Sequence, residues 1–312
     1  WAAGPSHRRM GATNESAAAE ATGATDACML AFGGLRLGLR SEAPFRDIGF
    51  PPSLETFRTD GPADVELDLR FATPRESELA GARPVFDSEG LWQLLEGDDR
   101  LFLALRGMDD GRLFRLAAFD RGLTRGTIVS DPAGKLGARG PLLPDPLEYP
   151  LGEALTVCLL AAGRGLLVHA CGLERDGRGF LLVGHSGAGK TTLARLARER
   201  FRVLNDDRVV LRLVDGVPWI HGTPWHGDCS EVSAAGAPLA GLWIINHGTS
   251  HRTFQLEPGR AAAEILARCF LPLWSAPGMA FTLSLLDDVT ARVPCSRLEF
   301  TPDTGVFDEV LR

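Results

Sequence analysis

The sequence is poor in lysine and has no excess of positive charge. Of its 33 Lys and Arg residues only two are lysine, Lys135 and Lys190, and 40 Asp and Glu residues bring the net charge to −7. Proteins that bind nucleic acid usually present a basic face. We therefore expect no nucleic-acid partner. A lysine kept at position 190 is consistent with a need for a compact ammonium group rather than a guanidinium.

The sequence also lacks long apolar stretches and closely spaced cysteines. No apolar run approaches the ~18 residues of a membrane-spanning helix, so we expect no membrane partner. The six cysteines form no Cys-x-x-Cys pair, which is typical of reduced, mostly buried thiols. Together these absences predict a cytoplasmic protein.

The length of 312 residues predicts two domains or one large one, and the composition favours a division into two. Residues 1–27 are rich in small residues and lack the apolar segment of a signal peptide, so we expect a disordered tail, with Met10 as a candidate initiator. Residues 28–150 are expected to form a smaller β-rich domain that ends in a Pro- and Gly-rich linker. Its predicted elements are strands at 65–71, 101–105 and 113–119 and a helix over 88–96 capped by Ser88.

The second domain, residues 151–312, opens with a predicted helix at 151–162. It contains the clearest motif of the chain, Gly184-His-Ser-Gly-Ala-Gly-Lys190-Thr191, which fits the phosphate-binding pattern G-x-x-x-x-G-K-[ST] at every fixed position. An apolar run before it predicts a strand at 179–183, and the apolar spacing after it predicts a helix at 192–200.

Glycines in such a loop let backbone N–H groups converge on phosphate, and the start of the following helix adds partial positive charge. Lys190 would reach the outer phosphates of ATP, and the hydroxyl of Thr191 would hold Mg²⁺. The predicted nucleotide contacts are Gly184, His185, Ser186, Gly187, Ala188, Gly189, Lys190, Thr191 and Thr192.

Two further features flank the loop. Asp176-Gly177 predicts a two-residue hairpin turn that pairs Arg175 with Arg178, and the same register brings His169 beside Gly184. After the loop, Asn205-Asp206-Asp207-Arg208 separates two predicted strands. A carboxylate pair at a strand end suits the handling of Mg²⁺ and a nucleophile, and an acidic surface turn is the alternative.

The segment that follows offers a rival site. His221, His226, Asp228 and Cys229 lie in a loop broken by Gly and Pro and could ligate a metal, although their spacing fits no standard zinc pattern. In the last third of the chain we expect strands at 241–246, 279–286 and 293–300 and a helix at 260–270.

The order of His169, the glycine-rich loop and Asp206-Asp207-Arg208 resembles the catalytic domain of HPr kinase/phosphorylase, a family related to the phosphoenolpyruvate carboxykinases. The resemblance covers residues 165–215. The sequence is also similar to related bacterial kinase-like proteins that carry a different N-terminal domain. The resemblance implies an α/β fold for the second domain, namely a P-loop domain with a mixed sheet. In the chain this domain follows the smaller β-rich domain.

The same resemblance implies transfer of the γ-phosphate of ATP to a hydroxyl, often a serine of a small protein or peptide. By that resemblance His169 and Asp206 would handle the acceptor proton beside Lys190, and Asp207 with Thr191 would hold Mg²⁺. The chain departs from the family pattern at Ala170, where the family has glycine, and the stretch linked to phosphorolysis is not found.

The sequence lacks the motifs of other nucleotide-binding classes. No D-x-x-G or N-K-x-D motif of a GTPase follows Thr191, and no L-S-G-G-Q-like signature of a transporter ATPase is present. A non-catalytic nucleotide-binding regulator stays open, because binding and catalysis use the same loop. The acceptor, the choice between ATP and GTP, and the oligomeric state, a homo-oligomer included, also stay open.

Overall fold

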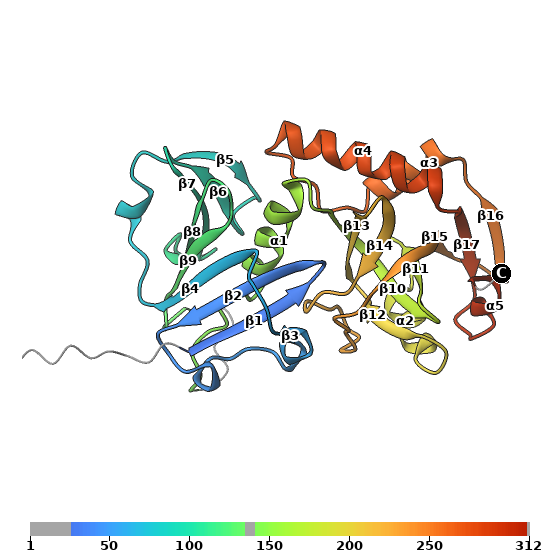
Figure 1. The fold of residues 1–312 in the computed structure, drawn as a ribbon, viewed down its shortest axis with the longest axis horizontal. Coiled ribbons are helices and arrows are strands. Elements are labelled where there is room, and N and C mark those ends of the chain that lie inside the picture. Colours follow the sequence, from blue (N-terminus) through green and yellow to red (C-terminus); the bar gives the residue numbers. More distant parts are fainter. Residues whose placement is uncertain (1–25, 135–140, 311–312) are drawn as a thin grey trace, which may run out of the picture.

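The computed structural model describes residues 26–134 and 141–310 and contains two β-sheets that lie beside each other (Figure 1). The tail predicted for residues 1–27 lies outside the described residues up to position 25, and a strand begins at Asp26. Within the described ranges, no helix is long and apolar enough to cross a membrane.

The first sheet has nine strands in the order β3-β1-β2-β4-β9-β8-β7-β6-β5. Short 3-10 helices at Phe45–Asp47, Pro52–Phe57 and Glu76–Leu79 lie in its connections. The strands are β1 (Asp26–Phe32), β2 (Leu35–Ser41), β3 (Arg58–Thr59), β4 (Val65–Phe71), β5 (Arg83–Asp87), β6 (Gln93–Glu96), β7 (Arg100–Arg106), β8 (Leu113–Asp120) and β9 (Arg125–Ser130).

The three strands predicted for this region are confirmed as β4, β7 and β8. In β4 Val65, Leu67 and Leu69 are buried and the polar residues between them are more exposed, as the alternation predicts. The helix predicted over 88–96 is wrong. Ser88 closes a turn instead, because its hydroxyl accepts a hydrogen bond from Trp92 N at 2.9 Å, and the chain then continues as β6.

The second sheet has eight strands, with the path β11-β10-β13-β14-β15-β17-β16 and β12 paired to β10. The long strand β15 pairs with β14 and also with β11, so that five strands close on themselves. The strands are β10 (Leu166–Arg175), β11 (Arg178–Val183), β12 (Arg202–Asn205), β13 (Arg208–Val214), β14 (Val217–His221), β15 (Gly236–His247), β16 (Arg252–Gln255) and β17 (Cys295–Phe300).

Within residues 26–134 and 141–310, five α-helices accompany the two sheets: α1 (Leu151–Ala161), α2 (Lys190–Ala197), α3 (Pro258–Leu266), α4 (Ala276–Arg292) and α5 (Val306–Val310). The predicted helices at 151–162, 192–200 and 260–270 correspond to α1, α2 and α3. The strand predicted at 279–286 is wrong, because this apolar segment lies inside α4. Ser275 starts that helix by accepting a hydrogen bond from Gly278 N at 3.0 Å.

The predicted α/β class, a P-loop domain with a mixed sheet behind a smaller β-rich domain, is wrong. Strands make up 39% of the structure and helices 23%, arranged as two large sheets in a β-rich fold. The physical reason is the way successive strands are joined. Asp-Gly turns at 176–177 and 215–216, with positive φ at each residue, connect β10 to β11 and β13 to β14 as antiparallel hairpins. Such turns leave no room for the crossover helices of an α/β domain.

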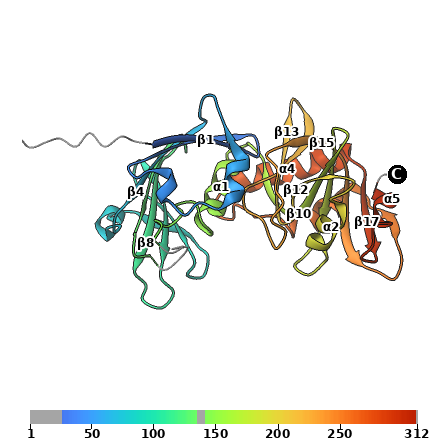
Figure 2. The same cartoon turned by 90° about the horizontal axis from the view of Figure 1, so that it is seen from below.

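Helix α1 and the tip of the β1–β2 hairpin join the two sheets (Figure 2). One hydrophobic core contains residues of the first sheet, most of α1, and Leu167 and Val210 of the second sheet. At the hairpin tip, Gly33 packs so closely on Val210 that an added Cβ would lie 2.7 Å from it. Arg212 donates a hydrogen bond to Gly33 O at 3.1 Å. The two sheets are therefore parts of one packed body.

Candidate functional site

The glycine-rich loop, residues 184–189, connects β11 to α2 as the sequence predicts. Gly187 and Gly189 have φ of +79° and +100°, a conformation that residues with a Cβ rarely adopt. An added Cβ at Gly184 would lie 2.8 Å from Ala188 and from Ile245, so this position also needs glycine. The motif residues are therefore required by the shape of the loop itself.

Lys190 begins α2 and turns its side chain back over the loop. Its Nζ donates hydrogen bonds to the carbonyl oxygens of Gly184 at 3.0 Å and His185 at 2.9 Å, and the residue is only 6% exposed. Burial lowers the pKa of Lys190, and the negative charges of Asp207 and Asp206 oppose this shift. The ammonium group is thus held at the mouth of the loop, among its backbone groups.

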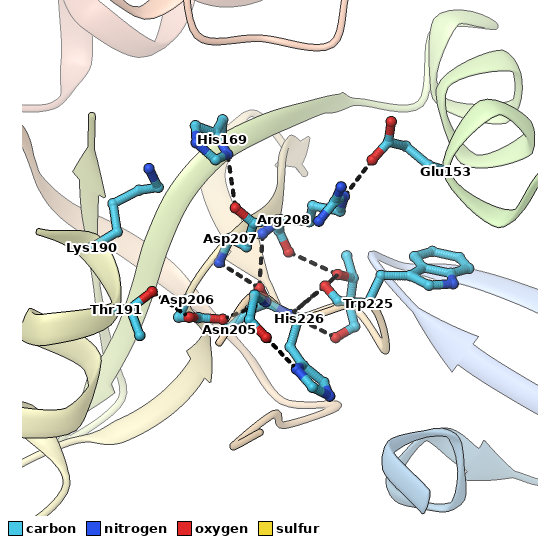
Figure 3. A network of polar contacts seen from close by, with 12 residues as sticks. Glu153, His169, Lys190, Thr191, Asn205, Asp206, Asp207, Arg208, Trp225 and His226 are labelled. Carbon is cyan, nitrogen blue, oxygen red and sulfur yellow. Dashed lines mark hydrogen bonds and ion pairs between the residues drawn. The ribbon is translucent and has the colours of Figure 1, made fainter. Parts of the chain in front are cut away.

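Asp206 is buried, with an exposure of 1%, and its carboxylate accepts three hydrogen bonds. Thr191 Oγ1 donates at 2.8 Å, Gly227 N at 2.8 Å and Cys229 N at 3.0 Å. These contacts tie the start of α2 to the loop after β14. They place a hydroxyl and a carboxylate side by side under the glycine-rich loop (Figure 3).

Asp207 lies beside Asp206 in the chain but belongs to a different set of contacts. His169 Nδ1 lies 2.9 Å from Asp207 Oδ1, and Arg208 pairs with the other carboxylate oxygen. Burial alone would raise the pKa of Asp207, but the hydrogen bond from His169 and the charges of Arg208 and Lys190 outweigh it and lower the pKa. The side chain is 17% exposed, so the carboxylate is reachable from solvent, and its lowered pKa favours the ionised form.

Arg208 is held between two carboxylates, Asp207 and Glu153 of α1. Its guanidinium also lies over the rings of Tyr149, at 5.8 Å, and Phe270, at 5.6 Å. Burial raises the pKa of Glu153, and the charge of Arg208 opposes this. Helix α1, which packs in the core of the first sheet, therefore supplies a charged group to the site on the second sheet (Figure 3).

Asn205 organises this turn. Its amide donates to Thr223 O at 2.9 Å and Trp225 O at 3.0 Å, while its Oδ1 accepts from Asp207 N at 2.7 Å and Arg208 N at 2.8 Å. The side chain is fully buried, so it fixes both the Asp-Asp turn and the loop that follows β14.

The hairpin prediction is confirmed. Arg175 pairs with Arg178, and the ladder of β10 and β11 runs to Ala170 opposite Val183. His169 lies one position beyond it and pairs with Arg208 of β13 instead. The expected neighbourhood of His169, the glycine-rich loop and the two aspartates is therefore present.

The four residues of the rival metal site are not brought together. His221 stacks on Trp219 at the end of β14, with ring centroids 5.9 Å apart. His226 contacts the neighbouring Gly227 O, and Asp228 is exposed. Over the described ranges, no cluster of three or more His, Cys, Asp and Glu residues is placed to hold a metal ion by itself.

Sequence reasoning missed three residues of this region. Glu153 and Asn205 showed no motif, since the pairing of Glu153 with Arg208 depends on how α1 packs. His247 is exposed at the end of β15, and its Nε2 lies 2.8 Å from Gly187 O at the apex of the loop. Only the parallel pairing of β11 with β15 brings it there, and no local pattern reveals that pairing.

Comparison with known families finds one similarity in this part of the chain. Residues 153–276 match the family described as SynChlorMet cassette protein ScmC. The matched segment begins at Glu153 and contains the glycine-rich loop, the Asp-Asp turn and the loop after β14. It spans less than half of the chain, so the similarity is confined to the part that builds the candidate site. No curated protein matches the sequence.

Proposed function

We propose that the chain is an ATP-dependent phosphotransferase that moves the γ-phosphoryl group of ATP to a hydroxyl of an acceptor. The observation that carries the proposal is the juxtaposition of a glycine-rich loop, its lysine and threonine, and two aspartates with separate partners. A cytoplasmic location belongs to the same proposal, and all six cysteines are free thiols, as expected in a reducing compartment.

The residues fit a magnesium nucleotide. The loop before α2 has positive φ at Gly187 and Gly189, with open space beside Gly187, and the backbone N–H groups of such a loop suit phosphate oxygens. The hydroxyl of Thr191 and the carboxylate of Asp206, at 2.8 Å from each other, are hard oxygen ligands of the kind that Mg²⁺ prefers. When bound there, Mg²⁺ would neutralise charge on the phosphates.

The two aspartates would have different roles, one in binding Mg²⁺ and the other in accepting a proton. From the family resemblance we assigned Asp206 with His169 to the acceptor proton and Asp207 to Mg²⁺; the hydrogen bonds favour the reverse division. Asp206 is paired with Thr191 in a buried position, whereas Asp207 is partly exposed, ionised and paired with His169. Asp207 would accept the proton of the acceptor hydroxyl, and His169 and Arg208 would keep its carboxylate oriented.

The test compares Asp206→Asn with Asp207→Asn in transfer of labelled phosphate from ATP, with ATP hydrolysis as a second readout. Asp207→Asn should bind ATP normally and lose ~10²–10⁴-fold in turnover, as expected for a lost general base. Asp206→Asn should instead need more Mg²⁺ for half-maximal rate, because an oxygen ligand is weakened. Asp228→Asn, an exposed carboxylate of the adjacent loop, is the matched control.

Two results would overturn the proposal. If Lys190→Ala binds ATP and turns it over like the unaltered chain, the loop is not a catalytic nucleotide site. If the unaltered chain binds ATP tightly but neither transfers nor hydrolyses phosphate, a regulatory nucleotide-binding role replaces the enzymatic one.

A further inference from the structure

The apex of the glycine-rich loop is its most loosely packed point. Gly187 has a φ of +79°, and a Cβ built there would meet nothing within 4 Å. The two ends of the loop are packed closely instead. A Cβ at Gly184 would lie 2.8 Å from Ala188, and one at Gly189 would lie 2.6 Å from the ring of Phe300. Because glycine has more backbone freedom than any other residue, packing alone does not fix the apex.

Hydrogen bonds to carbonyl groups hold the loop where packing does not. Lys190 Nζ donates to two carbonyls at the start of the loop, at 3.0 and 2.9 Å, and the carbonyl of Ser186 lies 2.6 Å from Nδ1 of His185. These partners belong to the motif itself. The carbonyl of Gly187 has a partner from outside the motif, since His247 Nε2 lies 2.8 Å from it. A carbonyl oxygen can only accept, so Nε2 of His247 carries the proton and donates.

The sheet fixes the position of His247. Strand β15 pairs in parallel with β11, which leads into the loop, and with β17, where His247 lies opposite Phe300. The two rings have centroids 5.7 Å apart and planes tilted by 32°, and Phe300 is only 1% exposed. Gly248 N donates to Phe300 O at 2.9 Å, which holds the backbone directly after His247. The imidazole therefore rests on a buried ring while the residue itself is exposed.

An anchored apex matters for binding phosphate. The N–H groups of a glycine-rich loop bind an anion when they converge on it. A peptide unit is planar, so the bond to the carbonyl of Gly187 fixes the peptide plane that follows this residue. Without that bond the apex would have to be ordered as the nucleotide binds, and the entropy lost would subtract from the binding free energy.

We propose that His247 is a positioning residue, which holds the glycine-rich loop in its phosphate-binding shape before the nucleotide arrives. The inference rests on the proposed function and adds a residue from outside the motif to the same nucleotide site. The hydrogen bond of His247 goes to the backbone of the loop and not to either aspartate. Its contribution is therefore to the affinity for the nucleotide and not to proton transfer.

The experiment measures the Kd of ATP in the presence of Mg²⁺ by titration calorimetry on the whole chain and its variants. His247→Phe keeps a ring on Phe300 but has no donor, whereas His247→Gln keeps an N–H donor without the ring. His251→Phe is the matched control, because it removes another exposed histidine contact, the one to Asp303 at 2.9 Å. Lys190→Ala shows whether the motif binds ATP at all.

We expect His247→Phe to weaken ATP binding ~3–10-fold, and His247→Gln and His251→Phe to stay within about twofold of the unaltered chain, as the net value of one hydrogen bond implies. The loop binds ATP in the ground state and in the transition state alike. In ATP hydrolysis the KM of His247→Phe should therefore rise by the same factor while kcat stays unchanged. Without nucleotide, His247→Phe should melt at the same temperature as His251→Phe, because both lose one exposed hydrogen bond.

Three results overturn the inference: ATP affinity in His247→Phe equal to that of the unaltered chain, binding by His247→Gln as weak as that of His247→Phe, or a fall in kcat with KM unchanged. Should His247→Phe melt below the control, His247→Ala removes the donor without adding bulk and must show the same loss of affinity. If Lys190→Ala loses ATP while His247→Phe binds it normally, the nucleotide site stands and only the role of His247 fails. If the unaltered chain binds no ATP, the proposed function fails as well.

Discussion

Removing the carboxylate of Asp206 should destabilise the fold by an amount set by its hydrogen bonds. In Asp206→Ala the buried N–H of Cys229 and the partly buried N–H of Gly227 lose their acceptor, while the hydroxyl of Thr191 can rotate to another partner. An unsatisfied buried donor costs about 1–3 kcal/mol and a partly buried one less, so the two together should lower the free energy of unfolding by about 1–5 kcal/mol.

The isosteric change Asp206→Asn should cause a smaller loss in the free energy of unfolding. Its remaining oxygen can serve Thr191 and Cys229, which share Oδ2, but its amide nitrogen then faces Gly227 N, donor against donor. One unsatisfied N–H predicts a loss of about 1–3 kcal/mol.

Urea unfolding monitored by tryptophan fluorescence measures all three proteins, with Asp228→Ala as the exposed control from the same loop. The expected order of stability is unaltered chain, Asp206→Asn, Asp206→Ala. If Asp206→Ala unfolds at the same urea concentration as the control, the carboxylate does not hold this loop and the reasoning is refuted.

Three further changes have definite directions. An added Cβ at Gly152 would lie 2.3 Å from Leu147 O, so Gly152→Ala should cost about 1–3 kcal/mol in thermal unfolding, whereas Gly259→Ala, with open space, should be neutral. Burial lowers the pKa of His221 to about 4. As the pH falls, the imidazole of His221 is therefore protonated in the unfolded chain before it is protonated in the folded chain. The free energy of unfolding should fall by up to ~3 kcal/mol from pH 6.5 to pH 4. Urea titrations at both pH values should show a smaller fall for His221→Phe. The depressed pKa of Asp207 contributes stability above about pH 4 that is lost as the pH falls, so the difference in unfolding free energy between Asp207→Asn and the unaltered chain should shrink at pH 3.

The parts of the fold that the sequence predicts correctly are those with a local cause. The Asp176-Gly177 turn sets the register of β10 and β11 because both residues must adopt positive φ, and the alternation of β4 follows from one buried face. The glycine-rich loop is recognisable because close approach leaves no alternative to glycine. These features need no knowledge of distant segments.

The errors arise where distant pairing decides. The apolar segment 279–286 suits a strand or a helix, and the Ser275 cap together with packing on α3 and α1 favours the helix. The fold class combines both causes: the Asp-Gly turns that exclude crossover helices are local, but the pairing of β15 with β11 and β14, which closes five strands on themselves, joins distant segments that carry no signature. Within the site, the partners of Asp206 and Asp207 could not be assigned, because adjacent residues point to different sides of the turn.

The shared core around α1 also limits how such a chain can change. Helix α1 packs among residues of the first sheet and presents Glu153 to Arg208, while Trp225 of the second half packs its ring 5.0 Å from Phe32. A chimera that exchanged the N-terminal sheet alone would lose the packing of that sheet on α1 and the contact of Phe32 with Trp225. An N-terminal sheet transplanted between relatives would therefore have to bring α1 and the partner of Phe32 with it.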